Sequence, residues 1–224
     1  LGEKSPNLKN DFSKIKKEEN VNSNLKLSIS NKTIQVLLMF AGVFCCVAMS
    51  MPQVHIVPLC IDNGFGLAVG TEILSFMLFA AVTSRVLFGF LSDKIGPIQT
   101  LILGSTLQAI SLSMFLPFNS QLSLYIVAIC FGLSQGGIVP IYAVIISKFL
   151  PENEVAERVG LLIFATIVGM SLGGWLSGEI YDYTNSYQMA FLNGIFWNLI
   201  NLLIMFYLFL KYKQSIKSVD KYEY

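Results

Sequence analysis

The chain has 224 residues, of which 54% are hydrophobic and only 13% are charged. With a mean hydropathy of +0.64, this composition is too apolar for a soluble core of this length and indicates a membrane protein. The formal net charge is +1, and Lys and Arg are not interleaved with aromatic residues, so nothing in the sequence favours a nucleic-acid partner.

Residues 1–32 are polar and rich in lysine, asparagine and serine. They contain too few apolar side chains to offset the ordering entropy of a fold, so we expect a disordered cytoplasmic linker. They do not resemble a secretory signal, because the positive region is too long and no cleavage site follows a short apolar stretch. Since the chain begins at Leu1 and not at a methionine, we expect a fragment of a longer protein.

Six apolar stretches follow, each long enough to cross about 30 Å of hydrocarbon as a helix. They cover residues 33–58, 72–91, 98–116, 122–149, 159–180 and 187–210. The connections between them are short and contain Gly, Pro, Asp or Asn. The sequence therefore predicts an all-α membrane protein, in which residues 33–212 form a bundle of six transmembrane helices and residues 213–224 form a cytoplasmic tail.

The positive residues outside the spans fall on one side of this predicted bundle. They lie in residues 1–32, in the second and fourth connections and in the tail, whereas the first, third and fifth connections contain no Lys or Arg. Positive residues are retained in the cytoplasm, so both ends of the chain are predicted to be cytoplasmic, and an even number of spans agrees with this. We expect a multi-pass protein of the plasma membrane or an inner membrane.

The sequence shows no pattern that indicates a catalytic site or a metal site. The four cysteines lie in or beside apolar stretches without a C-x-x-C pair, and His55 is the single histidine, so no zinc, haem or iron–sulfur spacing occurs. The sequence contains no G-x-x-x-x-G-K loop for ATP and no arrangement of nucleophile and base. We therefore predict no enzyme activity and no cofactor.

Small residues spaced four apart predict places where helix backbones approach each other closely in lipid. The pairs are Gly132 with Gly136, Gly169 with Gly173, and Gly174 with Gly178. Such pairs occur in any tight membrane bundle, so they do not by themselves indicate a transporter.

The second span ends in the run R-V-L-F-G-F-L-S-D-K-I-G, residues 85–96. Gly89 lies one helical turn after Arg85, Asp93 can start a tight turn that Gly96 closes, and Asp93 and Lys94 lie at the boundary with water. The pattern G-x-x-x-D-K-x-G resembles the signature loop of major facilitator transporters, which connects the second and third helices of each six-helix half. The alternative is a polar turn between any two membrane helices.

Three further runs extend the resemblance to major facilitator proteins of the monocarboxylate and oxalate/formate exchanger type. They are H-I-V-P-L-C-I-D-N-G at 55–64, G-L-S-Q-G-G-I-V-P at 132–140 and G-E-I-Y-D-Y-T-N-S-Y at 178–187. The resemblance implies the C-terminal half of a twelve-helix secondary transporter, whose other six helices are missing here.

Such a transporter moves a small organic anion by alternating access, with a proton or a counter-substrate as the coupled species. Its implied partners are therefore that anion, the coupled species, the missing half and the lipid bilayer. The alternative is a half-size or non-transporting scaffold protein that acts as a homodimer.

Arg85 is the first candidate for substrate binding, because a permanent cation inside a membrane helix is costly and its planar fork suits a carboxylate. The resembled transporters have a substrate-linked arginine four residues before the same glycine, but their acid one turn earlier is Ala81 here. This departure places a proton-coupled pair of arginine and acid in doubt. Alternatively, Arg85 snorkels to the cytoplasmic surface, about six residues or roughly 9 Å away.

Two other side chains are candidates for substrate binding. His55 lies near the outer end of the first span, where it can titrate for proton coupling, donate to a carboxylate, or serve as a hydrogen-bonded structural residue. Gln135 lies among the glycines of the fourth span and is a candidate for the cavity. We assign the signature loop a gating role, carried by Gly89, Asp93, Lys94 and Gly96.

Overall fold

The computed structural model describes residues 29–117 and 120–220, and all regular structure in this part of the chain is helical. The elements are α2 (Asn31–Asp62), α3 (Gly66–Ile95), α4 (Pro97–Met114), α5 (Gln121–Gln135), α6 (Ile138–Phe149), the short 3-10 helix η1 (Glu152–Glu154), α7 (Val155–Thr184) and α8 (Tyr187–Asp220). Residues 1–28 of the expected linker lie outside the described residues. The helix α8 continues past residue 213, where the tail was expected to begin.

Five helical segments in the described part of the chain are long and apolar enough to cross a membrane. They are α2, α3, the pair α5–α6, the segment Glu152–Thr184 and the part of α8 that ends at Ser215. The fold is therefore that of an all-helical membrane protein. The predicted third span corresponds to α4, which is not among the five because polar side chains lower its hydropathy. Three of these side chains, Thr100, Ser105 and Gln108, are fully buried within the bundle.

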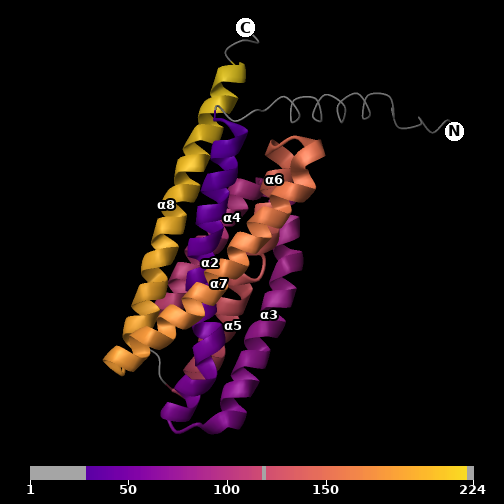
Figure 1. Ribbon diagram of the computed structural model, residues 1–224. Coiled ribbons are helices and arrows are strands. Elements are labelled where there is room, and N and C mark those ends of the chain that lie inside the picture. The colour runs from indigo at the N-terminus through magenta and orange to yellow at the C-terminus, as the bar shows by residue number, and fades with distance from the viewer. Residues whose placement is uncertain (1–28, 118–119, 221–224) are drawn as a thin grey trace, which may run out of the picture.

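The helix α2 lies at the centre of the bundle, between α7, α8 and α3, while α3 packs mainly against α5 (Figure 1). In the most apolar window of α2, 67% of the residues are buried, against 33% in α3 and 28% in the segment that contains α7. Much of the surface of α3 and α7 is therefore not covered by the helices described here.

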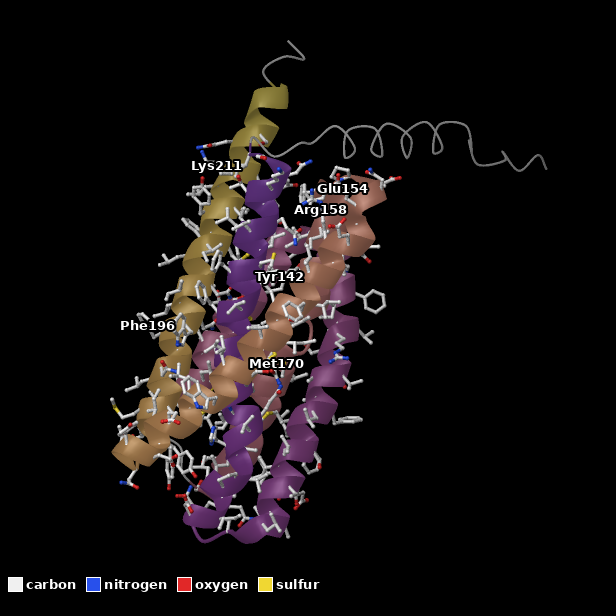
Figure 2. All side chains as sticks on the ribbon, viewed as in Figure 1. Tyr142, Glu154, Arg158, Met170, Phe196 and Lys211 are labelled. Atoms are coloured by element: carbon white, nitrogen blue, oxygen red, sulfur yellow. The ribbon has the colours of Figure 1, made fainter. Side chains whose placement is uncertain are left out.

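The start of α2, the end of α8 and the connection from α6 to α7 lie at the same end of the bundle (Figure 1). Figure 2 shows Lys211 and the pair of Glu154 and Arg158 at this end. This arrangement is the one expected if the positive residues outside the spans share one side of a membrane.

Close approach of backbones occurs at two of the three predicted glycine pairs. An added Cβ atom would lie within 2.2 Å of an α3 carbonyl oxygen at Gly132 and at Gly136, and within 2.5 Å of an α2 carbonyl oxygen at Gly169 and at Gly173. These distances are too short for any side chain, so the prediction is confirmed for these pairs. At positions 174 and 178 the nearest atoms lie at 3.4 and 3.8 Å, which leaves ordinary van der Waals space.

Candidate functional site

The fourth predicted span, expected to be continuous over 122–149, is divided at Gly136 and Gly137 into α5 and α6. Ser84 of α3 binds the backbone on both sides of this break. Its hydroxyl donates to the carbonyl oxygen of Leu133 at 2.6 Å and accepts the N–H of Gly137 at 3.2 Å. Pro140 lies in the first turn of α6, where its missing N–H removes no helical hydrogen bond. The break is therefore fixed in place by α3.

Gln135 is the last residue of α5 and is 1% exposed. It lies 14 residues from Gln121 and 14 from Phe149, the two ends of the apolar segment, which places it at the middle of that segment. The Nε2 atom of Gln53 on α2 donates to Oε1 of Gln135 at 2.9 Å. The Nε2 atom of Gln135 has no hydrogen-bond partner in the described part of the chain.

Arg85 is exposed on α3, and neither an ion pair nor a hydrogen bond joins its guanidinium to any described residue. The helix α3 continues to Ile95, beyond the end expected from the sequence. Arg85 therefore lies ten residues, or about 15 Å at 1.5 Å per residue, from the end of its helix. This depth makes snorkelling to the nearer surface harder than the sequence indicated.

The exposed surface of α3 around Arg85 consists of two strips with different side chains. One strip, which we call the open strip, carries small, polar or aliphatic residues three or four positions apart: Thr71, Ser75, Leu78, Val82, Arg85 and Gly89. The other strip carries the bulky side chains of Phe76, Phe79, Leu87 and Phe90, with Thr83 among them. Bulky apolar side chains suit lipid, whereas a strip that contains a guanidinium suits protein or water.

Ala81 occupies the position at which the resembled transporters have an acid. It is 7% exposed, and its backbone packs against Gly136, where an added Cβ would lie 2.0 Å from the Ala81 carbonyl oxygen. This position is therefore a packing contact between α3 and the break in α5–α6.

His55 faces a different part of the bundle from Gln135. Its Nε2 lies 3.3 Å from the carbonyl oxygen of Gly174 on α7, and its ring lies against Tyr187, with centroids 6.4 Å apart. Gln53, two residues earlier on α2, points instead to α5. In the described part of the chain, no hydrogen bond joins His55 or Arg85 to Gln135. Ser84, the residue before Arg85, nevertheless binds the backbone on both sides of Gln135.

The signature loop is built around Gly96. Its φ of 91° is a conformation that favours glycine, and its N–H donates to the Ser92 carbonyl at 2.9 Å to close α3 before Pro97 begins α4. Lys94 lies in the last turn of α3, at the negative end of the helix dipole, and Asp93 beside it is exposed. No described atom lies within 4 Å of a Cβ added at Gly89, so packing inside this bundle does not require glycine there.

Two polar clusters lie outside the predicted site. Asp62, at the end of α2, accepts hydrogen bonds from Tyr181 at 2.7 Å and from Tyr187 at 2.9 Å. The other cluster is fully buried around Tyr142, in the interior of the bundle in Figure 2, and its further members are Ser105, Asn198 and Asn201. The first cluster could have been predicted from the sequence, because the run Y-D-Y-T-N-S-Y lies at the same predicted end of the bundle as Asp62.

The family model of the Major Facilitator Superfamily matches residues 34–222 of the chain. The chain is 28% identical over 161 residues to "Monocarboxylate transporter 13" of Rattus norvegicus, and this match covers 71% of the chain and 36% of that protein. It is 29% identical over 168 residues to "MFS-type transporter opdF" of Penicillium oxalicum, which covers 71% of the chain and 40% of that protein.

These matched segments amount to little more than a third of each relative's length, 36% in the rat protein and 40% in the fungal one. Within this chain the family match extends from α2 to the end of α8 and so includes the signature loop, the broken helix and Arg85. The expectation drawn from the signature loop is therefore confirmed, and this chain belongs to the Major Facilitator Superfamily of membrane transporters.

Proposed function

We propose that this chain forms one six-helix half of a secondary transporter that moves a small organic anion, such as a monocarboxylate, by alternating access. In this proposal α4 is the sixth membrane-spanning helix, and both ends of the chain are cytoplasmic in a plasma or inner membrane. A second six-helix half covers the open strip. The sequence contains no ATP-binding loop, so a proton gradient or a counter-substrate drives transport, as symport or exchange.

The unpaired guanidinium of Arg85 is the observation that carries this proposal. It lies far from both ends of α3, on the open strip, and no described side chain neutralises it. A charge at this depth is tolerated where it faces protein or water, and Arg presents a fork that matches a carboxylate. The name of the rat relative agrees with a carboxylate substrate. We assign Arg85, His55 and Gln135 to substrate binding, and the loop of Gly89, Asp93, Lys94 and Gly96 to gating.

Uptake of labelled carboxylates into vesicles tests this proposal. We would compare the full-length protein with its Arg85→Gln variant, which keeps length and polarity but removes the charge. Loss of uptake of one acid, with unchanged membrane insertion, is the expected result.

Arg158→Gln is a matched control, because Arg158 on α7 pairs with Glu154 of η1, four residues earlier, and lies at the end of the bundle. It should keep uptake. If Arg85→Gln transports as well as the unchanged protein, Arg85 is not the anion contact and the carboxylate assignment is wrong.

A further inference from the structure

The side-chain amide of Gln135 has one polar atom satisfied and one not. Its Oε1 accepts from Gln53, whereas its Nε2 is buried without a partner in the described part of the chain. A buried amide donor without a hydrogen bond loses the bonds it would make to water, which destabilises the fold. A residue kept in this state inside a membrane is a candidate for binding something that supplies the missing acceptor.

Gln53 determines which polar atom of the Gln135 side chain has no hydrogen bond. Because Gln53 donates to Oε1, the amide plane of Gln135 is oriented so that Nε2 points away from Gln53. Gln53 itself is partly exposed on α2. The two glutamines therefore act as a unit, in which one residue positions a neutral donor on the other.

The backbone around Gln135 is held independently of its side chain. Ser84 binds the carbonyl of Leu133 and the N–H of Gly137, so the residues on both sides of Gln135 are anchored to α3. Broken helices at mid-membrane depth are places where transporters present polar groups to their substrates. The fixed backbone and the unsatisfied Nε2 coincide at such a break.

We infer that Gln135 is a specificity-determining residue, which donates a hydrogen bond from Nε2 to an uncharged oxygen of the transported anion, and that Gln53 is its positioning residue. This inference rests on the proposed function, in which Arg85 binds the carboxylate. A neutral donor, in addition to the cation of Arg85, distinguishes an acid that has a second, uncharged oxygen from one that has only its carboxylate.

The test compares butyrate with 3-hydroxybutyrate, two acids that differ in one hydroxyl group, for uptake by the full-length protein in vesicles. The readout is the ratio of the kcat/KM of the hydroxylated acid to that of the plain acid, which does not depend on how much protein each vesicle contains. In Gln135→Met, which keeps the side-chain volume but has no donor, this ratio should fall about tenfold, as expected for one lost hydrogen bond.

Gln53→Glu provides a second variant in which the pair stays bonded. A carboxylate at position 53 accepts from Nε2 of Gln135 and so withdraws that donor from the substrate, and the ratio should again fall. If the pair had only a structural role, a variant that keeps it bonded would leave the ratio unchanged.

Gln108→Met is the matched control. Gln108 is a fully buried glutamine on α4 whose two polar atoms both bond to Cys45, so its loss should affect both acids equally. An unchanged ratio in Gln135→Met and in Gln53→Glu would overturn the inference while leaving carboxylate transport intact. Uptake of neither acid by the unchanged protein would contradict the proposed small-carboxylate function and this inference with it.

Discussion

The hydroxyl of Ser84 accepts the backbone N–H of Gly137 at 3.2 Å and thereby joins α3 to the break between α5 and α6. The same hydroxyl donates to Leu133 on the other side of the break. A helix interrupted inside a membrane exposes backbone groups that lipid cannot bind, so they must be satisfied by protein. In this bundle a single serine side chain satisfies two of them.

Ser84→Ala should therefore destabilise the bundle. The substitution leaves the N–H of Gly137 and the carbonyl of Leu133 without this partner, and we expect the free energy of unfolding to fall by about 1–2 kcal/mol. Reaction of the buried thiols of Cys45, Cys46 and Cys60 with a thiol-specific dye during heating in detergent reports the unfolding temperature.

Ser75→Ala is the control on the same helix. The hydroxyl of Ser75 is exposed and donates only to the carbonyl of Thr71 within α3. Its removal should leave the unfolding temperature nearly unchanged. Equal effects of the two substitutions would show that Ser84 does not hold the break.

The sequence predicted the helical spans well and the polar contacts inside them poorly. Apolar length located α2, α3, α7 and α8, because hydrocarbon thickness imposes a minimum length on each of them. The spacing of Gly132 and Gly136 was correctly interpreted as a packing motif, but it also conceals the end of α5, since glycine permits both a close contact and a break.

The candidate site was only partly predictable for a related reason. Gln135 and Arg85 are conspicuous in apolar stretches, but Gln53 lies 82 positions from its partner Gln135, and no local pattern connects them. The depth of Arg85 was underestimated because the polar residues after Leu91 suggested an early end to α3. In the structure these residues continue the helix to Ile95.

Gly136→Ala should impair folding through contact with α3. The new methyl group would lie about 2.0 Å from the carbonyl oxygen of Ala81, so one of the two backbones must move. Overpacking of this kind costs about 1–3 kcal/mol, and we expect a lower unfolding temperature and less inserted protein. Thermal unfolding in detergent and the amount of membrane-inserted protein measure the two effects.

Gly160→Ala on α7 is the corresponding control, because no described atom lies within 4 Å of the added Cβ. Alanine is the better helix former by about 1 kcal/mol, so this variant should be as stable as the unchanged protein or more stable. A loss of stability at Gly160 as large as that at Gly136 would contradict the packing argument.

Asp62 should stabilise the opposite end of the bundle by joining α2 to α7 and α8. Asp62→Asn weakens the bonds from Tyr181 and Tyr187, and we expect only a small loss of stability because the carboxylate is exposed to water. A double-mutant cycle with Tyr181→Phe measures the coupling. Asp182→Asn, at an exposed acid on α7, should have no effect, and additivity of the Asp62 and Tyr181 substitutions would contradict the contact.

The buried polar cluster around Tyr142 should contribute to the stability of the bundle. Asn201 accepts from the hydroxyl of Tyr142 at 2.8 Å and donates to Ser105 at 2.9 Å, and all three side chains are fully buried. Asn201→Leu removes both bonds and the one that Asn201 donates to Asn198 at 3.3 Å, so the free energy of unfolding should fall by about 2–3 kcal/mol. Thiol exposure on heating in detergent measures this loss.

Asn193→Leu is the matched control for Asn201→Leu, on the same helix α8. Asn193 is only partly buried and accepts a single bond, from the Trp197 ring N–H at 3.1 Å. Its replacement should cost well under half as much, because water or a headgroup can satisfy the Trp197 donor. If both variants unfold at the same temperature as the unchanged protein, the cluster around Tyr142 is not a stabilising part of the bundle.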